Sequence, residues 1–305
     1  MTSPVRSRKM ASMNEADARA LAARLACWRE PVTPEPLSGG ITNRNYLVRH
    51  RGERFVVRVG ADIPVHQITR SNELAASRAA AAADISPEVT HYEPGALVLR
   101  FVEGRTLKPE DVQARPMLAR ILPLLRRCHR EVERHLRGAV QIFWVFHVVQ
   151  DYADTLSEGG SRFVRELPRL LAVASELRAA IGAIDIVFCH NDLLAANLIE
   201  AGDRLWLIDW DYAGFNSPLF DLANLSSNSE LRPQDEVWLL ESYFERPLTA
   251  DLARRYRAMR CASLLREAMW GMVSELHSSL DVDYVGYARD YLARLERGLA
   301  EFRHG

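Results

Sequence analysis

The chain has 305 residues, of which 48% are hydrophobic and 26% are charged, a composition typical of a folded globular protein rather than a disordered or fibrous one. Its formal net charge of -1 at pH 7 excludes a strong overall field that would attract nucleic acid or anionic lipid. The four cysteines are far apart and form no CxxC pair, which argues against a zinc site or a disulfide framework.

The apolar runs of the chain do not indicate a membrane protein. MTSPVRSRKM leads into polar, amphipathic residues rather than into an apolar signal core. The longest apolar run, FWVFHVV from Phe143, is too short to span a bilayer. We therefore expect a cytoplasmic protein with no membrane insertion. A chain of this length is near the size at which one core gives way to two, so we also expect two lobes, residues 1–102 and 103–305.

The first lobe alternates between helical and extended patterns, as a small α+β lobe does. Two hairpins are predicted from pairs of apolar runs, one joined by a turn with Gly52 and the other by Pro94-Gly95. An alanine-rich stretch of high helix propensity stops before Ser86-Pro87. The predicted elements are a helix from Glu15 to Arg29, strands from Tyr46 to Arg49 and Arg54 to Val59, a helix from Thr69 to Asp84, and strands from Val89 to Glu93 and Leu97 to Val102.

The second lobe is predicted to be mostly helical, with one region of short strands. Between Ile186 and Tyr212, the β-type runs IVFCH, NLIE and RLWLID alternate with polar breaks. Elsewhere apolar residues recur at helical spacing. These helical stretches are Pro109 to Leu136, Phe163 to Ile181, Pro233 to Phe244 and Asp251 to the end of the chain.

A short segment after the first of these strands carries the strongest chemical signal. His190 to Asn197 fits the spacing HxDLxxxN, in which an aspartate on a catalytic loop is followed five residues later by a metal-binding asparagine. Asp209 then ends an apolar strand, as a second magnesium ligand would. Asp192 would orient an acceptor hydroxyl and take its proton, while Asn197 and Asp209 would bind Mg²⁺. His190 is expected to brace the loop rather than to transfer protons.

A simpler alternative exists for this segment, because HxDxxxxN alone is a weak pattern that also occurs at strand ends with polar turn residues. The context favours catalysis: the motif follows a predicted strand in the helical lobe, and a second strand ends on an aspartate at a suitable distance. The sequence thus predicts transfer of the γ-phosphoryl group of ATP to an alcohol, with Mg²⁺ as cofactor.

The first lobe offers an independent test of this interpretation. Such an enzyme needs a basic residue on a strand to hold the α- and β-phosphates, and an acidic residue on the following helix to hold that base. Arg58 and Glu73 lie at these positions, fifteen residues apart. Arginine in place of lysine keeps the charge and changes the geometry. The alternative is that both are ordinary solvated charges.

Two backbone segments are candidates for the remaining nucleotide contacts. SGGITN can form a hairpin tip with bare amides facing phosphate oxygens, although an ordinary turn fits it equally well. LVLRFVEG is interpreted, from lobe order alone, as the strand and hinge where adenine would hydrogen-bond to the backbone around Arg100 to Val102. The candidate residues in these segments are Gly39, Gly40, Thr42, Asn43, Phe101 and Val102.

From about Leu37 to Ser279 the chain resembles the aminoglycoside phosphotransferase and choline kinase superfamily. The resemblance is carried by LSGGITNRNYLV, FVVRV, the helix with Glu73, CHNDLLAANLI and LIDWDYAGFNSPLFDLANL. It is greatest for the choline and ethanolamine kinase branch, in which an acidic residue and a tyrosine follow the metal-binding aspartate. Here these are Asp211 and Tyr212, with aspartate where glutamate is more usual. The resemblance implies a protein-kinase-like α+β fold, with a small β-rich nucleotide-binding lobe and a larger, mostly helical catalytic lobe.

The resemblance also implies how the acceptor is bound, with Asp211, Tyr212 and Trp270 as substrate-binding residues. Trp270 resembles the tryptophan motif on a late helix of choline kinases, but the second tryptophan expected three residues on is Val273 here. Asp221 would anchor the catalytic loop from below through buried hydrogen bonds. The candidate substitutes for the missing ring, with core packing as their alternative role, are Phe143, Trp144, Phe146 and Tyr243.

The resulting expectation is an ATP- and magnesium-dependent kinase of a small amino alcohol, with choline first and ethanolamine second. The same chemistry on thiamine, an aminoglycoside or a sugar is the first alternative. A nucleotide-binding scaffold that has lost catalysis is the second, although Asp192, Asn197 and Asp209 are all present. Nucleic acid is not an expected partner. The sequence leaves the oligomeric state open, with a homodimer as one alternative.

Overall fold

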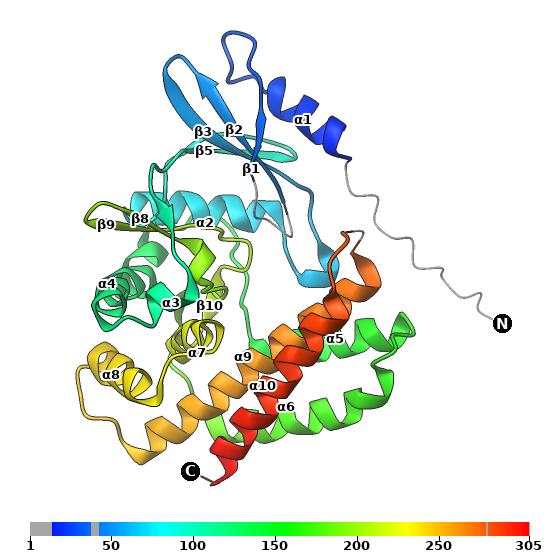
Figure 1. The fold of residues 1–305 in the computed structure, drawn as a ribbon, viewed down its shortest axis with the longest axis vertical. Coiled ribbons are helices and arrows are strands. Elements are labelled where there is room, and N and C mark those ends of the chain that lie inside the picture. Colours follow the sequence, from blue (N-terminus) through cyan, green and yellow to red (C-terminus); the bar gives the residue numbers. More distant parts are fainter. Residues whose placement is uncertain (1–13, 38–42, 279, 305) are drawn as a thin grey trace, which may run out of the picture.

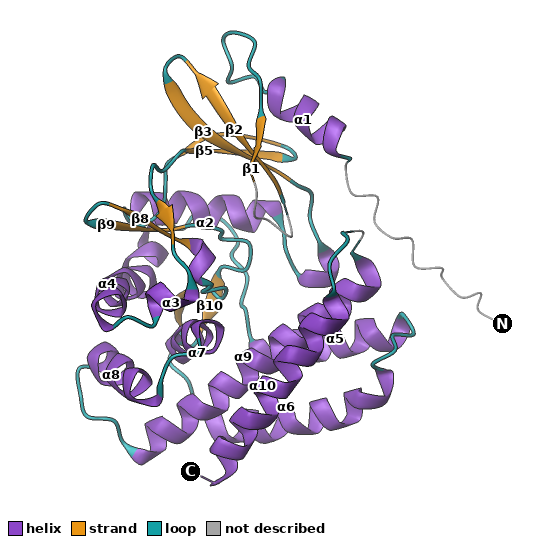
Figure 2. Ribbon diagram, in the orientation of Figure 1, coloured by secondary structure: helices purple, strands orange, loops and turns teal. Residues whose placement is uncertain are grey.

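A small five-stranded antiparallel sheet lies beside a larger, mostly helical part in the computed structural model, which describes residues 14–37, 43–278 and 280–304 (Figures 1 and 2). This arrangement confirms the expected α+β architecture. Within the described residues, no helix has the length and apolar content needed to cross a membrane.

The sheet has the strand order β1-β2-β3-β5-β4, and its strands pair antiparallel. Arg51 and Gly52 join β2 to β3 with φ angles of 52° and 79°, the left-handed conformation that a two-residue hairpin turn requires. The elements of this part are α1 (Glu15–Ala23), β1 (Glu35–Leu37), β2 (Arg44–His50), β3 (Glu53–Val59), η1 (Pro64–His66), α2 (Arg70–Ala82), β4 (Val89–Glu93) and β5 (Ala96–Arg100).

The side chains of β3 alternate between the two faces of the sheet. Val57 and Val59 belong to a small hydrophobic cluster with Ala18 and Ala22 of α1, on the outer face (Figure 1). Arg58 lies between these valines in the sequence and points to the opposite face, where it contacts α2. The sheet therefore presents this cation to the helical part of the molecule.

The helical part is organised around α9, whose residues 261–274 are all buried. This helix contacts α5, α6, α7 and α10 (Figure 1). A helix surrounded in this way is mostly apolar in its buried stretch. The elements are β6 (Arg105–Thr106), α3 (Pro109–Val112), α4 (Arg115–Glu131), η2 (Val132–His135), α5 (Val145–Glu158), η3 (Val164–Glu166), α6 (Leu167–Ile181), β7 (Val187–Cys189), η4 (Ala195–Asn197), β8 (Leu198–Ala201), β9 (Arg204–Leu207), β10 (Gly214–Asn216), α7 (Pro218–Ser229), α8 (Pro233–Phe244), α9 (Ala250–His277) and α10 (Tyr284–His304).

Several elements differ from those predicted. The helices α5 and α7 were not predicted, and α7 is buried on nearly all sides, so no amphipathic stripe indicates it. α1 ends at Ala23 rather than Arg29, because the prolines that follow set only an outer limit. β1 contains Pro36 at the edge of the sheet, where a missing N–H costs no ladder bond. The final helical stretch is two helices, α9 and α10.

One buried carboxylate, Asp221 in the first turn of α7, holds the start of the loop that follows β7. Its Oδ2 accepts a hydrogen bond from the His190 amide at 2.9 Å, and its Oδ1 accepts one from the Asn191 amide at 2.8 Å. The ring nitrogen Nε2 of His129 donates to Oδ2 at 2.8 Å. Burial alone would raise the pKa of Asp221, but the bond from His129 holds it below its usual value. The anchoring role expected for Asp221 is therefore confirmed.

A second link joins the segment between β3 and α2 to the helical part. His66 is buried, with Nδ1 3.2 Å from the Tyr152 hydroxyl of α5 and Nε2 3.1 Å from the Ser274 hydroxyl of α9. Its ring stacks on Trp270 with a centroid separation of 5.4 Å. Burial, together with the positive charge of Arg266, lowers the pKa of His66 to about 3. This imidazole is therefore neutral in the folded protein at physiological pH.

Replacing Asp221 by asparagine should lower the free energy of unfolding by about 3 kcal/mol, because an amide cannot accept all three of these buried hydrogen bonds. Denaturant unfolding at pH 7, followed by circular dichroism, measures the change. Asp203→Asn is the matched control, since Asp203 is an exposed carboxylate in the turn between β8 and β9. Equal losses in the two variants would contradict the anchoring role.

Acidification should destabilise the protein through His66. The folded pKa lies below the value of about 6.5 in an unfolded chain, so between these values the unfolded state binds a proton that the folded state does not. The contribution of His66 to the free energy of unfolding is therefore full above pH 6.5 and is lost as the pH falls toward the folded pKa. Between pH 7 and pH 5 the wild type should lose about 2 kcal/mol more than His66→Gln. Denaturant unfolding at several pH values tests this, with the exposed His147→Gln as control; parallel curves for wild type and His66→Gln would refute it.

Candidate active site

The loop after β7 is held by hydrogen bonds to both ring nitrogens of His190. His190 is fully buried, and its Nε2 donates to the Ile208 carbonyl at 2.9 Å. Its Nδ1 then accepts a weaker bond from the Asp192 amide at 3.3 Å. Burial lowers the pKa of His190, so the ring is neutral. His190 therefore ties the loop to the residue that precedes Asp209, an arrangement that fits the bracing role predicted for it.

The predicted catalytic carboxylate and the predicted metal-binding amide are in direct contact. The Asn197 amide nitrogen donates to the Asp192 carbonyl at 2.8 Å and lies 3.4 Å from Asp192 Oδ2. The Asp192 side chain is 17% exposed. Burial, together with the carboxylates of Glu267 and Asp209, raises the pKa of Asp192 to about 8. The positive charge of Arg266 opposes this shift and does not cancel it. Asp192 is thus a carboxyl with unusually high proton affinity.

Asp209 and Asn197 are the residues that would hold a metal. Asp209 has a left-handed φ of 67°, and its side chain is 24% exposed. Because the amide nitrogen of Asn197 points to Asp192, its oxygen is turned to the other side. A carboxylate and an amide oxygen are the hard donors that Mg²⁺ prefers. The carboxylates that raise the pKa of Asp192 create the excess negative charge that a divalent cation would neutralise. The donor set therefore fits magnesium.

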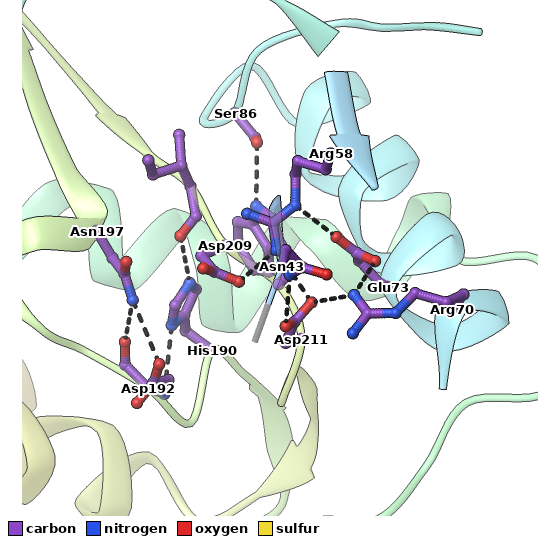
Figure 3. A network of polar contacts seen from close by, with 12 residues as sticks. Asn43, Arg58, Arg70, Glu73, Ser86, His190, Asp192, Asn197, Asp209 and Asp211 are labelled. Carbon is purple, nitrogen blue, oxygen red and sulfur yellow. Dashed lines mark hydrogen bonds and ion pairs between the residues drawn. The ribbon is translucent and has the colours of Figure 1, made fainter. Parts of the chain in front are cut away.

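Asp211 connects the two parts of the molecule through buried charges (Figure 3). Its Oδ1 lies 3.1 Å from Arg58 Nη2 and 3.0 Å from Arg70 Nη1. Both arginines also contact Glu73, each at 2.7 Å, and Asn43 donates to Asp211 Oδ2 at 3.0 Å. The Arg58–Glu73 contact expected from the sequence is present. Arg70 was missed, although its place three residues before Glu73 on the same helix was a usable signal.

This network also bears on the role of Arg58. The same Nη2 that contacts Asp211 donates to Asp209 Oδ1 at 2.7 Å. Burial alone would lower the pKa of Arg58, but the carboxylates of Asp209, Glu73 and Asp211 raise it well above its ordinary value. The guanidinium is therefore charged and lies beside a predicted metal ligand, which is where a phosphate-binding cation would be needed.

The remaining nucleotide-binding candidates are only partly covered by the structure. Phe101 follows β5, and its amide donates to the Arg54 carbonyl at 3.0 Å, so this donor is used within the sheet. Adenine contacts at Phe101 and Val102 stay predictions. Three further candidates lie outside the described residues: Gly39, Gly40 and Thr42.

The two predicted acceptor-binding rings, Trp270 and Tyr212, are in direct contact. Trp270 Nε1 donates to the Tyr212 hydroxyl at 2.9 Å. Val273 is fully buried, and the neighbouring ring comes instead from Tyr287 of α10, with a centroid 5.5 Å from that of Trp270. The Tyr287 hydroxyl donates to Glu267 Oε2 at 3.0 Å. Tyr287 was missed because the sequence does not show which residue of a later helix meets Trp270.

The other aromatic candidates have different surroundings. Tyr243 contacts His129 Nδ1 through its hydroxyl at 2.7 Å, beneath the catalytic loop, which is a core position. Trp144 and Phe146 pack on each other with centroids 5.2 Å apart. Phe143 packs edge-on against Tyr212 with centroids 6.1 Å apart, and so does reach the acceptor-binding rings.

Two charged residues next to Asp192 were also missed. Arg266 and Glu267 lie in the buried middle of α9, and Arg266 Nη1 is 3.8 Å from Asp192 Oδ1. The available signal was their position one turn before Trp270, in a stretch of mostly apolar residues. Arg58 therefore lies on the predicted phosphate side of the site, and Arg266 lies on the predicted acceptor side.

Comparisons with known proteins agree with this geometry. A family model described as choline/ethanolamine kinase matches residues 35–233. Protein LicA of Haemophilus influenzae is 27% identical over 256 residues, covering 80% of this chain and 94% of the relative. Ethanolamine kinase 2 of Mus musculus is 25% identical over 292 residues, covering 86% and 75%.

Among solved structures, a choline/ethanolamine kinase family protein from Mesorhizobium loti has a TM-score of 0.76 and 28% identity, covering 94% of this chain and 96% of that one. The family model spans well over half of the sequence, including the loop of Asp192 and the segment of Asp209 and Asp211. The chain therefore belongs to the choline/ethanolamine kinase family and is a small-molecule kinase.

Proposed function

We propose that this kinase transfers the γ-phosphate of ATP to the hydroxyl of choline or ethanolamine, with Mg²⁺ bound by Asn197 and Asp209. The observation that carries the proposal is the grouping around Asp192, a partly exposed carboxylate in contact with Asn197 and tied through His190 to the segment of Asp209. Family membership supports an amino-alcohol acceptor.

In the proposed reaction Asp192 does the proton chemistry. The ionised form of Asp192 can orient the acceptor hydroxyl and take its proton, and the raised pKa makes that form a stronger base. A divalent cation bound beside Asp192 would favour the ionised form. The hydroxyl oxygen forms a bond to the γ-phosphorus, the bond to the bridging oxygen of ADP breaks, and the proton stays on Asp192 until it is released to water. Bound magnesium would neutralise charge on the phosphates.

Arg58 and the predicted glycine-rich tip would hold the phosphates from the sheet side. Glu73 holds the Nε of Arg58, so the Nη2 of the same guanidinium faces Asp209. Gly39, Gly40, Thr42 and Asn43 would supply polar contacts to phosphate oxygens. Binding energy from these groups positions the γ-phosphorus for attack, and such positioning supplies much of the rate enhancement in phosphoryl transfer.

Wild-type protein should release ADP in the presence of choline or ethanolamine, and Asp192→Asn should lower kcat by about a thousandfold while ATP still binds. A coupled ADP assay with choline, ethanolamine, thiamine, kanamycin and glucose as acceptors measures this, with Asp203→Asn as the control. Faster turnover on thiamine, kanamycin or glucose would replace the proposed acceptor. If the protein binds ATP but shows no acceptor-dependent turnover with any of these compounds, the result would favour the nucleotide-binding scaffold that has lost catalysis.

Magnesium dependence should be sensitive to Asp209. Asp209→Asn keeps the shape of the side chain and removes its charge, so the Mg²⁺ concentration for half-maximal rate should rise by about tenfold or more. Titration of Mg²⁺ at saturating ATP and acceptor measures it, with Asp203→Asn as the control. An unchanged Mg²⁺ requirement would remove Asp209 from the metal site.

A further inference from the structure

A buried ion pair lies in the middle of the helix that forms the acceptor side. Arg266 and Glu267 have side chains that are 1% and 4% exposed, in a stretch of α9 where all neighbours are buried. Arg266 Nη1 donates to Glu267 Oε1. Replacing a buried ion pair by apolar residues of similar volume is often neutral or stabilising. Stability therefore gives little reason for this pair, and its position suggests a role in the site.

The guanidinium of Arg266 covers the face of Tyr212, a ring that the family resemblance implies for the acceptor. Its central carbon is 4.3 Å from the centroid of the Tyr212 ring and 5.6 Å from that of Phe143. Both distances are within the range of cation–π attraction. The chain thus places its own cation on Tyr212, 3.8 Å from the carboxylate expected to receive the acceptor hydroxyl.

The second predicted ring is also partly covered by the protein. His66 stacks on Trp270 at 5.4 Å with an interplanar angle of 28°, and Tyr284 and Tyr287 approach Trp270 at steeper angles. Trp270 is 7% exposed and Tyr212 is 5% exposed. These rings therefore offer little open face to a ligand.

Two further oxygen-bearing side chains near Trp270 are those of Glu267, which is also buried, and of Tyr287, which is half-buried. Glu267 Oε2 and the Tyr287 hydroxyl lie 3.0 Å apart, one helix turn from Trp270. A quaternary ammonium has no N–H, so it depends on ring faces and on charge. A primary ammonium has three donors, and it can hydrogen-bond to a carboxylate and a hydroxyl without an aromatic face.

In an amino alcohol the nitrogen is two carbons from the hydroxyl, so the acceptor cation must come close to Asp192 and to Arg266. We propose that Arg266 is a specificity-determining residue: by covering the Tyr212 face, it makes the site prefer ethanolamine, whose nitrogen carries N–H donors, to choline. This inference rests on the proposed function and concerns the choice between its two acceptors.

The test is the ratio of kcat/KM for choline to that for ethanolamine, measured with both acceptors in competition. Such a ratio is independent of the fraction of protein that is folded. The wild-type ratio should be below one. Arg266→Met alone would leave the charge of Glu267 buried without its partner. We therefore compare two variants that both carry Glu267→Gln: the single variant, and the double variant Arg266→Met/Glu267→Gln. The difference between their ratios measures the effect of Arg266. Methionine keeps the length and apolar packing of the side chain.

The double variant should raise the ratio about tenfold over Glu267→Gln, as expected when one cation–π face is freed. Arg266→Lys should stay close to wild type. The matched control is Arg260→Met/Glu236→Gln, which removes a second largely buried ion pair, between α9 and α8, with atoms 2.8 Å apart. A wild-type ratio above one, or equal ratios in the double variant and Glu267→Gln, would overturn the inference. Absence of turnover on both alcohols would instead refute the proposed function.

Discussion

Two arginines and three carboxylates meet where the sheet joins the helical part, and the geometry of the site depends on them. Removing each charge from water costs several kcal/mol, so every member must be matched by a partner at short range. Arg58 and Arg70 do this by sharing Glu73 and Asp211. Because Asp211 comes from the segment after β9, its pairing fixes that segment against the sheet. The third carboxylate, Asp209, is the most exposed of the three, at 24%, and it carries the negative charge that the two arginines leave unbalanced.

The backbone at the site is held in conformations that it would not adopt alone. Asn191 and Asp209 both have left-handed φ angles, 64° and 67°. This conformation costs about 1 to 2 kcal/mol for most residues with a side chain, and less for Asn and Asp. Asn191 is retained by Asp221 and by its own amide, which donates to the Tyr212 carbonyl at 3.0 Å. His190 bonds the carbonyl just before Asp209. These buried hydrogen bonds offset the strain and hold the predicted base, Asp192, and the predicted metal ligand, Asp209, at fixed positions relative to each other.

Local sequence patterns predicted the parts of the structure that depend on neighbours in the chain. The β2–β3 hairpin, the helix with Glu73 and the segment from His190 to Asn197 follow from short-range periodicity, turn residues and spacing. Contacts between distant residues did not follow, because they depend on how elements pack. Arg70 and Asp211 are 141 residues apart in the sequence. For α7, burial on nearly all sides removed the periodic signal that would have indicated a helix.

The phosphate side and the acceptor side of the site differ in how they are built. The groups expected to bind the metal and to take the proton come from one continuous stretch, residues 190–212, which Arg58 joins to the sheet. The rings that pack on Trp270 come from η1 and α10, and its indole N–H donates to Tyr212, so the predicted acceptor side is assembled from segments far apart in the sequence. Arg266 is the point where the two sides meet, because its guanidinium lies on Tyr212 and also faces Asp192. A substitution of Arg266 should therefore have two effects: it changes access to the Tyr212 ring, and it changes the charge beside Asp192. The charge effect acts on both alcohols alike, so the ratio of kcat/KM between the two alcohols reports the access effect alone.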